Sequence, residues 1–302
     1  MKPGHIPIEK MESENKKGKW FKRVVLGLAC ANFFVWLAIA DSASRKAAEI
    51  WFFDVGQGDA ALVQLPDGLQ IVIDGGPNNA VLEKLGRAMP FYDREIDWVV
   101  LSHTDRDHLA GLLAVLKNYQ VNNILWSGFA GDDAEDAEWE RLIAQEGAAI
   151  KIAVAGERLL LSQNPPVVLE VLAPDQSDKI SGKDQNELST IIKFSYGARS
   201  FLFCGDAKSD AQGFADAAQD AFADVLKVSH HGSKYSTTAG FLAKVLPAAA
   251  VISAGEKNPY GHPHPEVLDL LENYDIRTLR TDTAGDIVFR TDGKRIFART
   301  QK

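Results

Sequence analysis

Short apolar runs separated by glycine- and proline-containing turns dominate the chain from residue 50 onward. Runs of five to seven residues that are rich in Val, Ile, Leu and Phe predict β-strands. We expect strands at IWFFDV, ALVQL, LQIVI, IDWVVLS, VNNILW, KIAVA, VVLEVLA, TIIKFSY, SFLFCGD, DVLKVSH and AAVISA and near the C-terminus. Apolar positions at helical spacing predict helices at 80–89, 109–118, 132–146, 208–222, 238–246 and 264–273.

The predicted strands fall into two β-rich blocks, one before and one after about residue 150. Each block finishes with alternating strands and helices. This order favours two sheets packed face to face with helices outside over one doubly wound sheet. We therefore expect a four-layer αββα sandwich of the α/β (α+β) class, covering residues 49–302.

Residues 1–48 differ from the rest of the chain in pattern and charge. Residues 1–23 hold seven basic and three acidic side chains, and residues 24–40 form an apolar run with Asn32 as its clearly polar member. About 17 to 25 apolar residues can span a bilayer, so the run predicts a membrane-spanning segment with its basic end in the cytoplasm. A signal peptide cleaved near Ala40 is the alternative. Both place the main domain outside the cytoplasm.

Charge and cysteine content narrow the classes of protein that fit. The whole chain carries −8 and residues 1–23 carry +4, which leaves about −12 for the remainder. This acidity argues against a protein that coats nucleic acid through charge alone. It permits a nuclease or esterase whose metal ions attract phosphate locally. The two cysteines, Cys30 and Cys204, are too few for a disulfide framework.

Four side chains able to bind metal follow the apolar run IDWVVL: His103, Asp105, Asp107 and His108. Imidazole and carboxylate groups together suit Zn²⁺, Mn²⁺ or Fe²⁺. No single backbone geometry points four such neighbours at one atom. We therefore expect two nearby ions, with the first two residues on one and the last two on the other. A solvated polar turn whose aspartate caps the next helix is the alternative.

Other predicted strands end in residues of the same kind. Asp206 follows SFLFCG, and His230 and His231 follow DVLKVS. Asp74 in VIDGG and Asp59 in GQGD also lie at strand ends beside glycines. Loops at strand ends are where rigid scaffolds present functional groups, so these residues are candidates for the same site.

The spacing HxDxDH after a strand, with a later GD and HHG, resembles the metallo-β-lactamase superfamily. The stretches FFDVGQGDAALVQL, VIDGG, HTDRDHLAG, NELS, CGDA, VLKVSHHGSKYST and YGHPHPEVL are similar to the metallo-β-lactamase-like domain of ComEC-type DNA uptake proteins and to related small exported hydrolases. The likeness runs from about residue 49 to 295.

The resemblance implies a role for each matching residue. His103 and Asp105 would hold one divalent ion, Asp107 and His108 the other, and Asp206 would bridge them. His231 would complete the second site, with His230 as the other candidate or a phosphate contact. The resemblance also implies that Asp74, and less directly Asp59, would orient the metal loop. Ser233, Lys234 and His262 are candidates to contact a substrate phosphate, because hydroxyl, ammonium and imidazole donors suit it; a solvated surface lysine and an ordinary loop histidine are the alternatives for the last two.

Two positions depart from the commonest pattern of the superfamily. Asp105 stands where many relatives have a second histidine, and Asn186 stands where many have a third histidine on the first metal. Both changes remove nitrogen ligands, so the first ion could be Mn²⁺ rather than Zn²⁺ or bind weakly, and the centre holds one or two ions. ComEC-type sequences share both features.

The resemblance implies hydrolysis of a phosphodiester by a hydroxide between two ions about 3.5 to 4 Å apart, with Asp107, Asp206 and His231 central to catalysis. DNA is the expected substrate, in an uptake context that requires a separate membrane channel as a partner. A metallo-phosphoesterase acting on a choline-phosphate or cell-wall ester is the first alternative. A non-catalytic module that guides DNA is the second.

Overall fold

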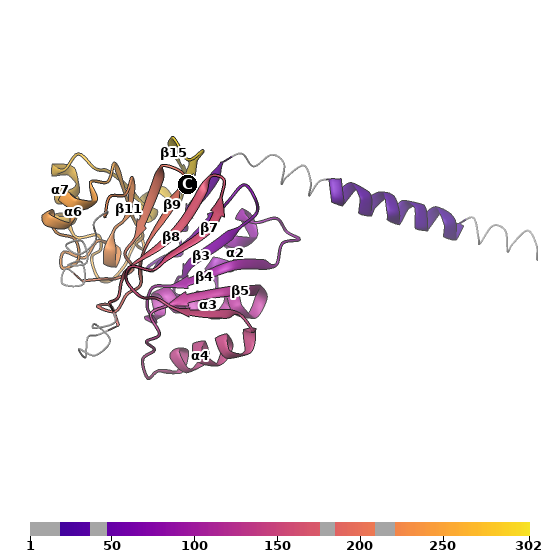
Figure 1. The fold of residues 1–302 in the computed structure, drawn as a ribbon, viewed down its shortest axis with the longest axis horizontal. Helices are drawn as coiled ribbons and strands as arrows, with labels where there is room; N and C mark the ends of the chain where they lie inside the picture. The colour runs from indigo at the N-terminus through magenta and orange to yellow at the C-terminus, as the bar shows by residue number, and fades with distance from the viewer. Residues whose placement is uncertain (1–18, 37–46, 176–184, 209–220) are drawn as a thin grey trace, which may run out of the picture. The chain divides into compact units, whose positions relative to one another are not determined.

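Two β-sheets, one of eight strands and one of seven, build the part of the chain after Ala47 that the structure describes (Figure 1). The structure is a computed structural model, and it describes residues 19–36, 47–175, 185–208 and 221–302. The chain divides into two compact units, Met1–Lys46 and Ala47–Lys302. The second unit begins two residues before the domain boundary expected from the sequence.

The first sheet joins both ends of the second unit. Its strand order is β15-β14-β1-β2-β3-β4-β5-β6, and its four strands β3 to β6 run parallel. The bounds are β1 (Ala48–Phe52), β2 (Ala60–Gln64), β3 (Gln70–Gly75), β4 (Glu95–Leu101), β5 (Gln120–Trp126), β6 (Ala149–Ile152), β14 (Asp286–Thr291) and β15 (Ile296–Gln301).

The second sheet has the order β13-β12-β11-β10-β9-β8-β7, and strands β10 to β13 run parallel. The bounds are β7 (Arg158–Gln163), β8 (Pro166–Ala173), β9 (Ile191–Tyr196), β10 (Arg199–Phe203), β11 (Val225–Lys227), β12 (Ala249–Ile252) and β13 (Arg277–Arg280). The parallel strands of each sheet therefore end at one edge, where side chains from several strands meet.

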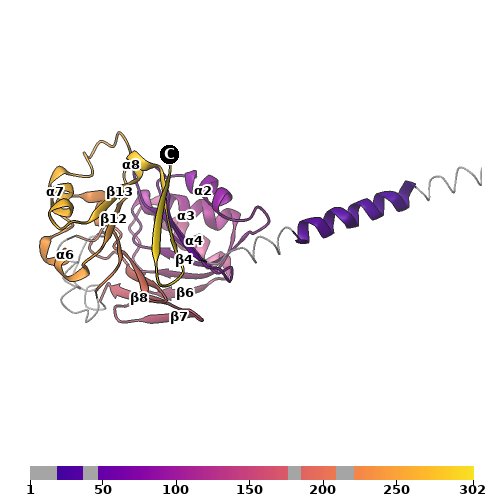
Figure 2. The same ribbon diagram turned by 90° about the horizontal axis from the view of Figure 1, so that it is seen from above.

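Helices cover the outer face of each sheet. The helices α2 (Ala80–Ala88), α3 (Arg106–Asn118) and α4 (Ala134–Glu146) belong to the first half of the unit. The helices α6 (Ala239–Val245), α7 (Pro265–Asn273) and α8 (Thr281–Ala284) and the 3₁₀ turn η3 (Ser229–Gly232) belong to the second half. Figure 2 shows α6 and α7 on one side of the strands and α2, α3 and α4 on the other.

Three apolar clusters hold these four layers together. The cluster between the sheets contains the stacked rings of Phe52 and Phe203, which come from different sheets and have centroids 5.5 Å apart. The cluster outside the first sheet contains Trp139, and the cluster outside the second contains Leu271. Each sheet is thus apolar on both faces, as a four-layer αββα sandwich requires, and this architecture is confirmed.

The predicted strands differ from the observed strands in three respects. Strand β6 covers part of KIAVA but pairs with β5 in the first sheet. The C-terminal strands β14 and β15 also join the first sheet, through β1. Strand β7, at RLLLSQ, was not expected, because its run shows few of the β-branched and aromatic residues typical of strands. Most of the helix expected at 208–222 lies outside the described residues.

The N-terminal unit contains a helix over residues 19–36. Three basic residues, Lys19, Lys22 and Arg23, occupy its first turns, so the apolar part within it is 24–36. Among the described residues, no helix has the length and apolar character needed to cross a membrane. The spanning segment expected at 24–40 is thus not confirmed, and residues 37–40 lie outside the described ranges.

Candidate metal centre

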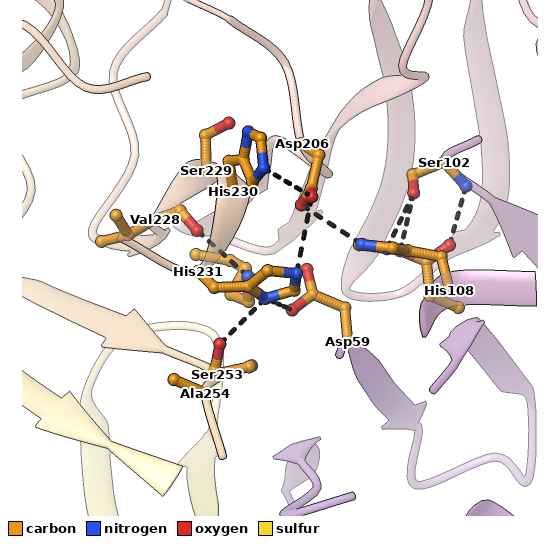
Figure 3. Close-up of polar contacts among 12 residues, drawn as sticks. Asp59, Ser102, His108, Asp206, Val228, Ser229, His230, His231, Ser253 and Ala254 are labelled. Atoms are coloured by element: carbon orange, nitrogen blue, oxygen red, sulfur yellow. Dashed lines mark hydrogen bonds and ion pairs between the residues drawn. The ribbon is translucent and has the colours of Figure 1, made fainter. Parts of the chain in front are cut away.

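Ligand-type side chains from three strand ends converge on the carboxylate of Asp206 (Figure 3). Asp206 follows β10, and its Oδ1 lies 3.2 Å from Nε2 of His108. Its Oδ2 lies 3.4 Å from Nε2 of His231 and 3.6 Å from Nε2 of His230. Both Asp206 and His231 are almost fully buried, whereas the side chain of His230 is 28% exposed. Three imidazoles thus surround one buried carboxylate.

His231 is held with one ring nitrogen directed into the site. Its Nδ1 lies 3.0 Å from the carbonyl oxygen of Ser253, directly after β12. A carbonyl oxygen only accepts, so Nδ1–H donates to it, and Nε2 is the ring nitrogen that faces the carboxylates of the site. That Nε2 lies 3.2 Å from Oδ2 of Asp107 in the first turn of α3. The contact links the two sheets across the site.

His108 is oriented by a carboxylate in the same way. Its Nδ1 lies 2.9 Å from Oδ2 of Asp74, at the end of β3. Asp74 also accepts hydrogen bonds from the backbone N and the hydroxyl of Ser102, both at 2.8 Å. His108 donates a hydrogen bond from Nδ1–H to Asp74, and this turns its Nε2 toward Asp206. Metal-binding histidines usually have an outer carboxylate or carbonyl partner of this kind.

The backbone is strained at His230 and His231 and closely packed next to His108. His230 and His231 both have left-handed backbones, with φ of 50° and 53°. Such residues cost about 1 to 3 kcal/mol each and cluster at functional sites. At the other side of the site, α3 approaches β3 so closely that a Cβ at Gly111 would overlap the backbone oxygen of Gly75. The glycine brings the helix that carries His108 against Asp74.

His103 and Asp105 form a separate pair on the loop between β4 and α3. Nε2 of His103 lies 3.6 Å from Oδ2 of Asp105, and the ring centroids of His103 and His108 are 4.2 Å apart. The side chain of Asp105 is 44% exposed. Gln185 bonds to Thr104 on this loop at 2.7 Å. The next residue, Asn186, has a buried Oδ1 with no hydrogen-bond partner among the described residues.

The structure brings some of the predicted site residues into two close groups and leaves others outside them. Ligand atoms of one group lie within 4.8 Å of one another: Asp107, His108, Asp206 and His231. A second group under the same limit, Asp59, Asp74 and His108, is fully buried. His103 and Asp105 lie next to the first group but do not belong to it. Asn186 contacts none of these side chains within hydrogen-bonding distance.

Charge makes the buried part of the centre incomplete without a cation. With neutral imidazoles, the buried carboxylates of Asp59, Asp74 and Asp206 are opposed, among the residues that the structure describes, by one buried ammonium group, that of Lys227. A buried excess of negative charge is strongly unfavourable unless protons or metal ions neutralise it. The centre therefore requires positive charge from outside the chain.

The pKa directions show how protons would provide this charge. Burial lowers the pKa of His108, but Asp206 and Asp74 outweigh it and hold that pKa well above its usual value. Burial is likewise outweighed for His231, whose pKa is raised by Asp206 and Asp59. Burial raises the pKa of Asp206, but the two histidines reverse this and hold the pKa well below its usual value. The metal-free centre thus favours imidazolium–carboxylate pairs.

The donor set fits one or two divalent metal ions. Nε2 of His103 is buried and has no hydrogen-bond partner among the described residues, and Nε2 of His108 and Oδ1 of Asp206 face each other at 3.2 Å. A mixture of imidazole nitrogen and carboxylate oxygen suits Zn²⁺ and Mn²⁺. Bound ions would replace the protons on His108 and His231 and satisfy these atoms. The identity of the ion is not fixed by this set.

Two of the candidate phosphate contacts, Ser233 and Lys234, directly follow η3, and the third, His262, lies near His230 and His231. His262 has its ring centroid 5.7 Å from that of His230 and 6.2 Å from that of His231. Burial, together with the neighbouring histidines, lowers the pKa of His262 to about 4, so its ring is neutral at pH 7. Ser233 is buried and follows η3 directly, and Lys234 is exposed.

Sequence reasoning missed two residues that support the site. Lys227 is buried at the end of β11 with Nζ 2.6 Å from Oδ2 of Asp59, whose Oδ1 lies 3.3 Å from Nδ1 of His231. Ser102 links His103, at 3.0 Å, to Asp74. A lysine in the middle of the apolar run DVLKVS was the available signal for the first. Nothing in the local pattern distinguishes Ser102 from an ordinary strand-end serine.

Comparison with known families agrees with this geometry. Residues 53–256 match the family described as the Metallo-beta-lactamase superfamily. The solved structure of CmlA, a diiron beta-hydroxylase from Streptomyces venezuelae, is 13% identical in sequence and superposes with a TM-score of 0.51. The match covers 77% of this chain and 52% of CmlA. At this identity the likeness concerns the fold alone.

Three curated relatives match most of this chain, and one of them is named a competence protein. ComE operon protein 3 of Bacillus subtilis is 32% identical over 87% of this chain and 35% of its own length. Competence protein ComA of Neisseria gonorrhoeae is 28% identical over 87% of this chain and 35% of its own. Recombination protein 2 of Haemophilus influenzae is 28% identical over 81% and 29%. The chain thus spans about a third of the length of the curated relatives it matches.

Proposed function

The chain belongs to the metallo-β-lactamase superfamily, and we propose that it is a metal-dependent phosphodiesterase that hydrolyses DNA. The observation that carries the proposal is the convergence of Asp107, His108, Asp206 and His231 within 4.8 Å of one another. The names of the competence relatives support DNA as the substrate. A nuclease of this kind would act during DNA uptake, with a separate channel protein as its partner.

Each residue of the centre has a proposed role in holding the ions or in orienting the residues that hold them. Divalent ions bound at the centre would supply a water of lowered pKa and neutralise charge on a phosphoryl oxygen. His108, Asp107, Asp206 and His231 would hold the second ion, and His103 and Asp105 the first. Asp74 and the carbonyl of Ser253 keep the imidazoles turned so that Nε2 faces the centre.

Three further side chains are proposed to bind the phosphate of the substrate. His262 is close to both His230 and His231, and its low pKa keeps the ring neutral and able to donate one hydrogen bond. The hydroxyl of Ser233 and the ammonium of Lys234 add donors that suit phosphate. His230, which is partly exposed, is near both His262, with ring centroids 5.7 Å apart, and Asp206, with Nε2 3.6 Å from Oδ2.

The test is hydrolysis by the full chain loaded with Mn²⁺ or Zn²⁺. We expect release of p-nitrophenol from methyl p-nitrophenyl phosphate and fragments from a labelled oligonucleotide. Asp206→Ala removes the central carboxylate and should lower kcat by at least about 100-fold. Asp269→Ala, an exposed aspartate on α7, is the control and should retain activity. Activity on the small ester with no attack on DNA would favour a different phosphoester, and DNA binding without any turnover would favour a guiding module.

Export of the domain is part of the same proposal. The basic residues before the apolar run at 24–40 support it. Fusing residues 1–48 to alkaline phosphatase, which is active outside the cytoplasm, tests it. Phosphatase activity of this fusion is expected. An inactive phosphatase fusion, together with an active fusion of the same residues to β-galactosidase, which works only in the cytoplasm, would contradict export. The size of the exported product shows whether cleavage occurs near Ala40.

A further inference from the structure

Two exposed tyrosines lie on the loops that adjoin the histidines of the metal centre. Tyr235 is 69% exposed and comes four residues after His231. Tyr260 is 63% exposed and comes two residues before His262. Both rings are therefore accessible to a ligand that approaches the centre.

Backbone contacts join the two loops into one surface. The backbone N of Lys234 donates to Nδ1 of His264 at 3.2 Å, and the backbone N of His264 donates to the carbonyl of Gly232 at 3.0 Å. Asn258 closes the second loop, because its side chain bonds to the backbone N and the carbonyl of His262, at 2.9 and 2.6 Å. Tyr260 therefore occupies the tip of a fixed turn.

Ring contacts connect this surface to the metal ligands. The rings of Tyr260 and His262 are stacked with centroids 5.7 Å apart and an interplanar angle of 22°. His262 in turn has its centroid 6.2 Å from that of His231. Neighbouring rings thus connect exposed Tyr260 to His231, whose Nε2 lies 3.4 Å from Oδ2 of Asp206.

A lysine accompanies each tyrosine. Nζ of Lys234 lies 5.3 Å from the centroid of the Tyr235 ring. Lys257 is exposed on the loop of Tyr260. Because the chain after residue 40 is strongly acidic, these cations are local features and not part of a general basic surface.

We propose that Tyr235 and Tyr260 form a stacking platform that selects single-stranded nucleic acid for the metal centre. This inference rests on the proposed phosphodiesterase function and specifies the form of its substrate. Unpaired bases stack on the two rings while Lys234 and Lys257 contact the neighbouring phosphates. Aromatic faces combined with lysines are the usual means of binding single strands without sequence preference. In a duplex the base faces are covered, so the platform has no partner there.

The experiment compares binding and turnover in Tyr235→Ala, Tyr260→Ala and the double variant of the full chain. Binding is measured as the change in anisotropy of a fluorescein-labelled 12-nucleotide oligothymidine in Ca²⁺. Turnover is measured with the same oligonucleotide and with methyl p-nitrophenyl phosphate, which has no base. Tyr260→Phe keeps the ring. Tyr92→Ala removes a tyrosine that is 49% exposed in the loop before β4, away from the strand ends that carry the ligands.

Each alanine substitution should weaken oligonucleotide binding by about 5- to 30-fold. The ratio of kcat/KM for the oligonucleotide to kcat/KM for the small ester should fall by the same factor. Tyr260→Phe and Tyr92→Ala should bind like the wild type, and the wild type should bind a 12-base-pair duplex less tightly than the single strand. Unchanged binding in the double variant, or equal affinity for duplex and single strand, overturns the platform.

The binding arm separates this inference from the proposed function. If the wild type hydrolyses neither substrate, the phosphodiesterase proposal fails, and the anisotropy of the tyrosine variants still decides whether the platform exists. If the wild type hydrolyses both substrates and the variants bind DNA normally, the phosphodiesterase proposal stands and the platform is wrong.

Discussion

The ammonium group of Lys227 lies 2.6 Å from the carboxylate of Asp59, and both side chains are more than nine-tenths buried between the two sheets. Lys227 also donates to the carbonyl of Val228 at 3.0 Å. Asp59 in turn approaches Nδ1 of His231 at 3.3 Å. The buried Lys227–Asp59 ion pair therefore contacts His231 on its Nδ1 side, opposite the Nε2 that faces Asp206.

Breaking this pair from one side should be costly. Lys227→Met leaves the Asp59 carboxylate buried without its cation, and we expect a loss of about 3 to 5 kcal/mol in the free energy of unfolding measured by urea titration. The double variant Lys227→Met/Asp59→Asn should recover part of the loss, because no uncompensated charge remains. Lys117→Met is the comparison, since the Lys117–Glu138 pair is 2.8 Å long but its side chains are 50% and 28% exposed. Equal losses in Lys117→Met and Lys227→Met would contradict this account.

Asp74 should control metal affinity without touching the metal. Asp74→Asn weakens the acceptor for Nδ1–H of His108, so the imidazole is held less firmly and is less basic at Nε2. We expect the Kd for Zn²⁺ or Mn²⁺, measured by calorimetry, to rise about 10- to 100-fold. Asp97→Asn is matched to it, because Asp97 accepts from the backbone N of Gln70 at 2.8 Å but lies at the start of β4. An unchanged Kd in Asp74→Asn would mean that His108 needs no partner.

Two helical glycines should respond in opposite directions to alanine. Gly111→Ala forces α3 away from β3, because the new Cβ overlaps the Gly75 backbone. We expect a loss of at least about 1 to 3 kcal/mol in unfolding free energy, with weaker metal binding since His108 moves with the helix. Gly86→Ala in α2 meets no atom within 4 Å and should stabilise by about 0.5 to 1 kcal/mol. Destabilisation of similar size in both variants would show that helix glycines matter here for another reason.

The thiol of Cys204 should be inert in the folded chain. Burial raises its pKa to about 12, so the reactive thiolate is almost absent at pH 8. Titration with 5,5′-dithiobis(2-nitrobenzoic acid) should detect one fast thiol in the native chain, that of exposed Cys30, and two after unfolding in guanidinium chloride. Two fast thiols before unfolding would place Cys204 in reach of solvent.

Local pattern sufficed for most strands, for the helices around the site and for the four-layer architecture. The apolar runs are long enough to specify strands, but they do not specify which sheet a strand joins. Strand β6 and the pair β14–β15 complete the first sheet through pairings that depend on the whole fold. Such long-range pairing carries no signal in a window of ten residues.

The candidate site shows the same division between local and long-range information. Each ligand-type residue was visible at the end of an apolar run, and family likeness suggested that they meet. The sequence could not show that His108 and His231 turn Nε2 toward Asp206 because Asp74 and the Ser253 carbonyl hold Nδ1. Nor could it separate His230 from His231, whose side chains are 28% and 2% exposed in the folded chain.

Metal content is the measurement that tests the central claim most directly. The full chain is stripped with a chelator, equilibrated by dialysis against micromolar Zn²⁺ or Mn²⁺ and assayed by inductively coupled plasma mass spectrometry. The account predicts one or two ions per wild-type chain and a large loss of bound metal in Asp206→Ala and His231→Ala, with circular dichroism showing that both variants are folded. Wild-type chains that bind no ion, or variants that bind as many ions as the wild type, would contradict it.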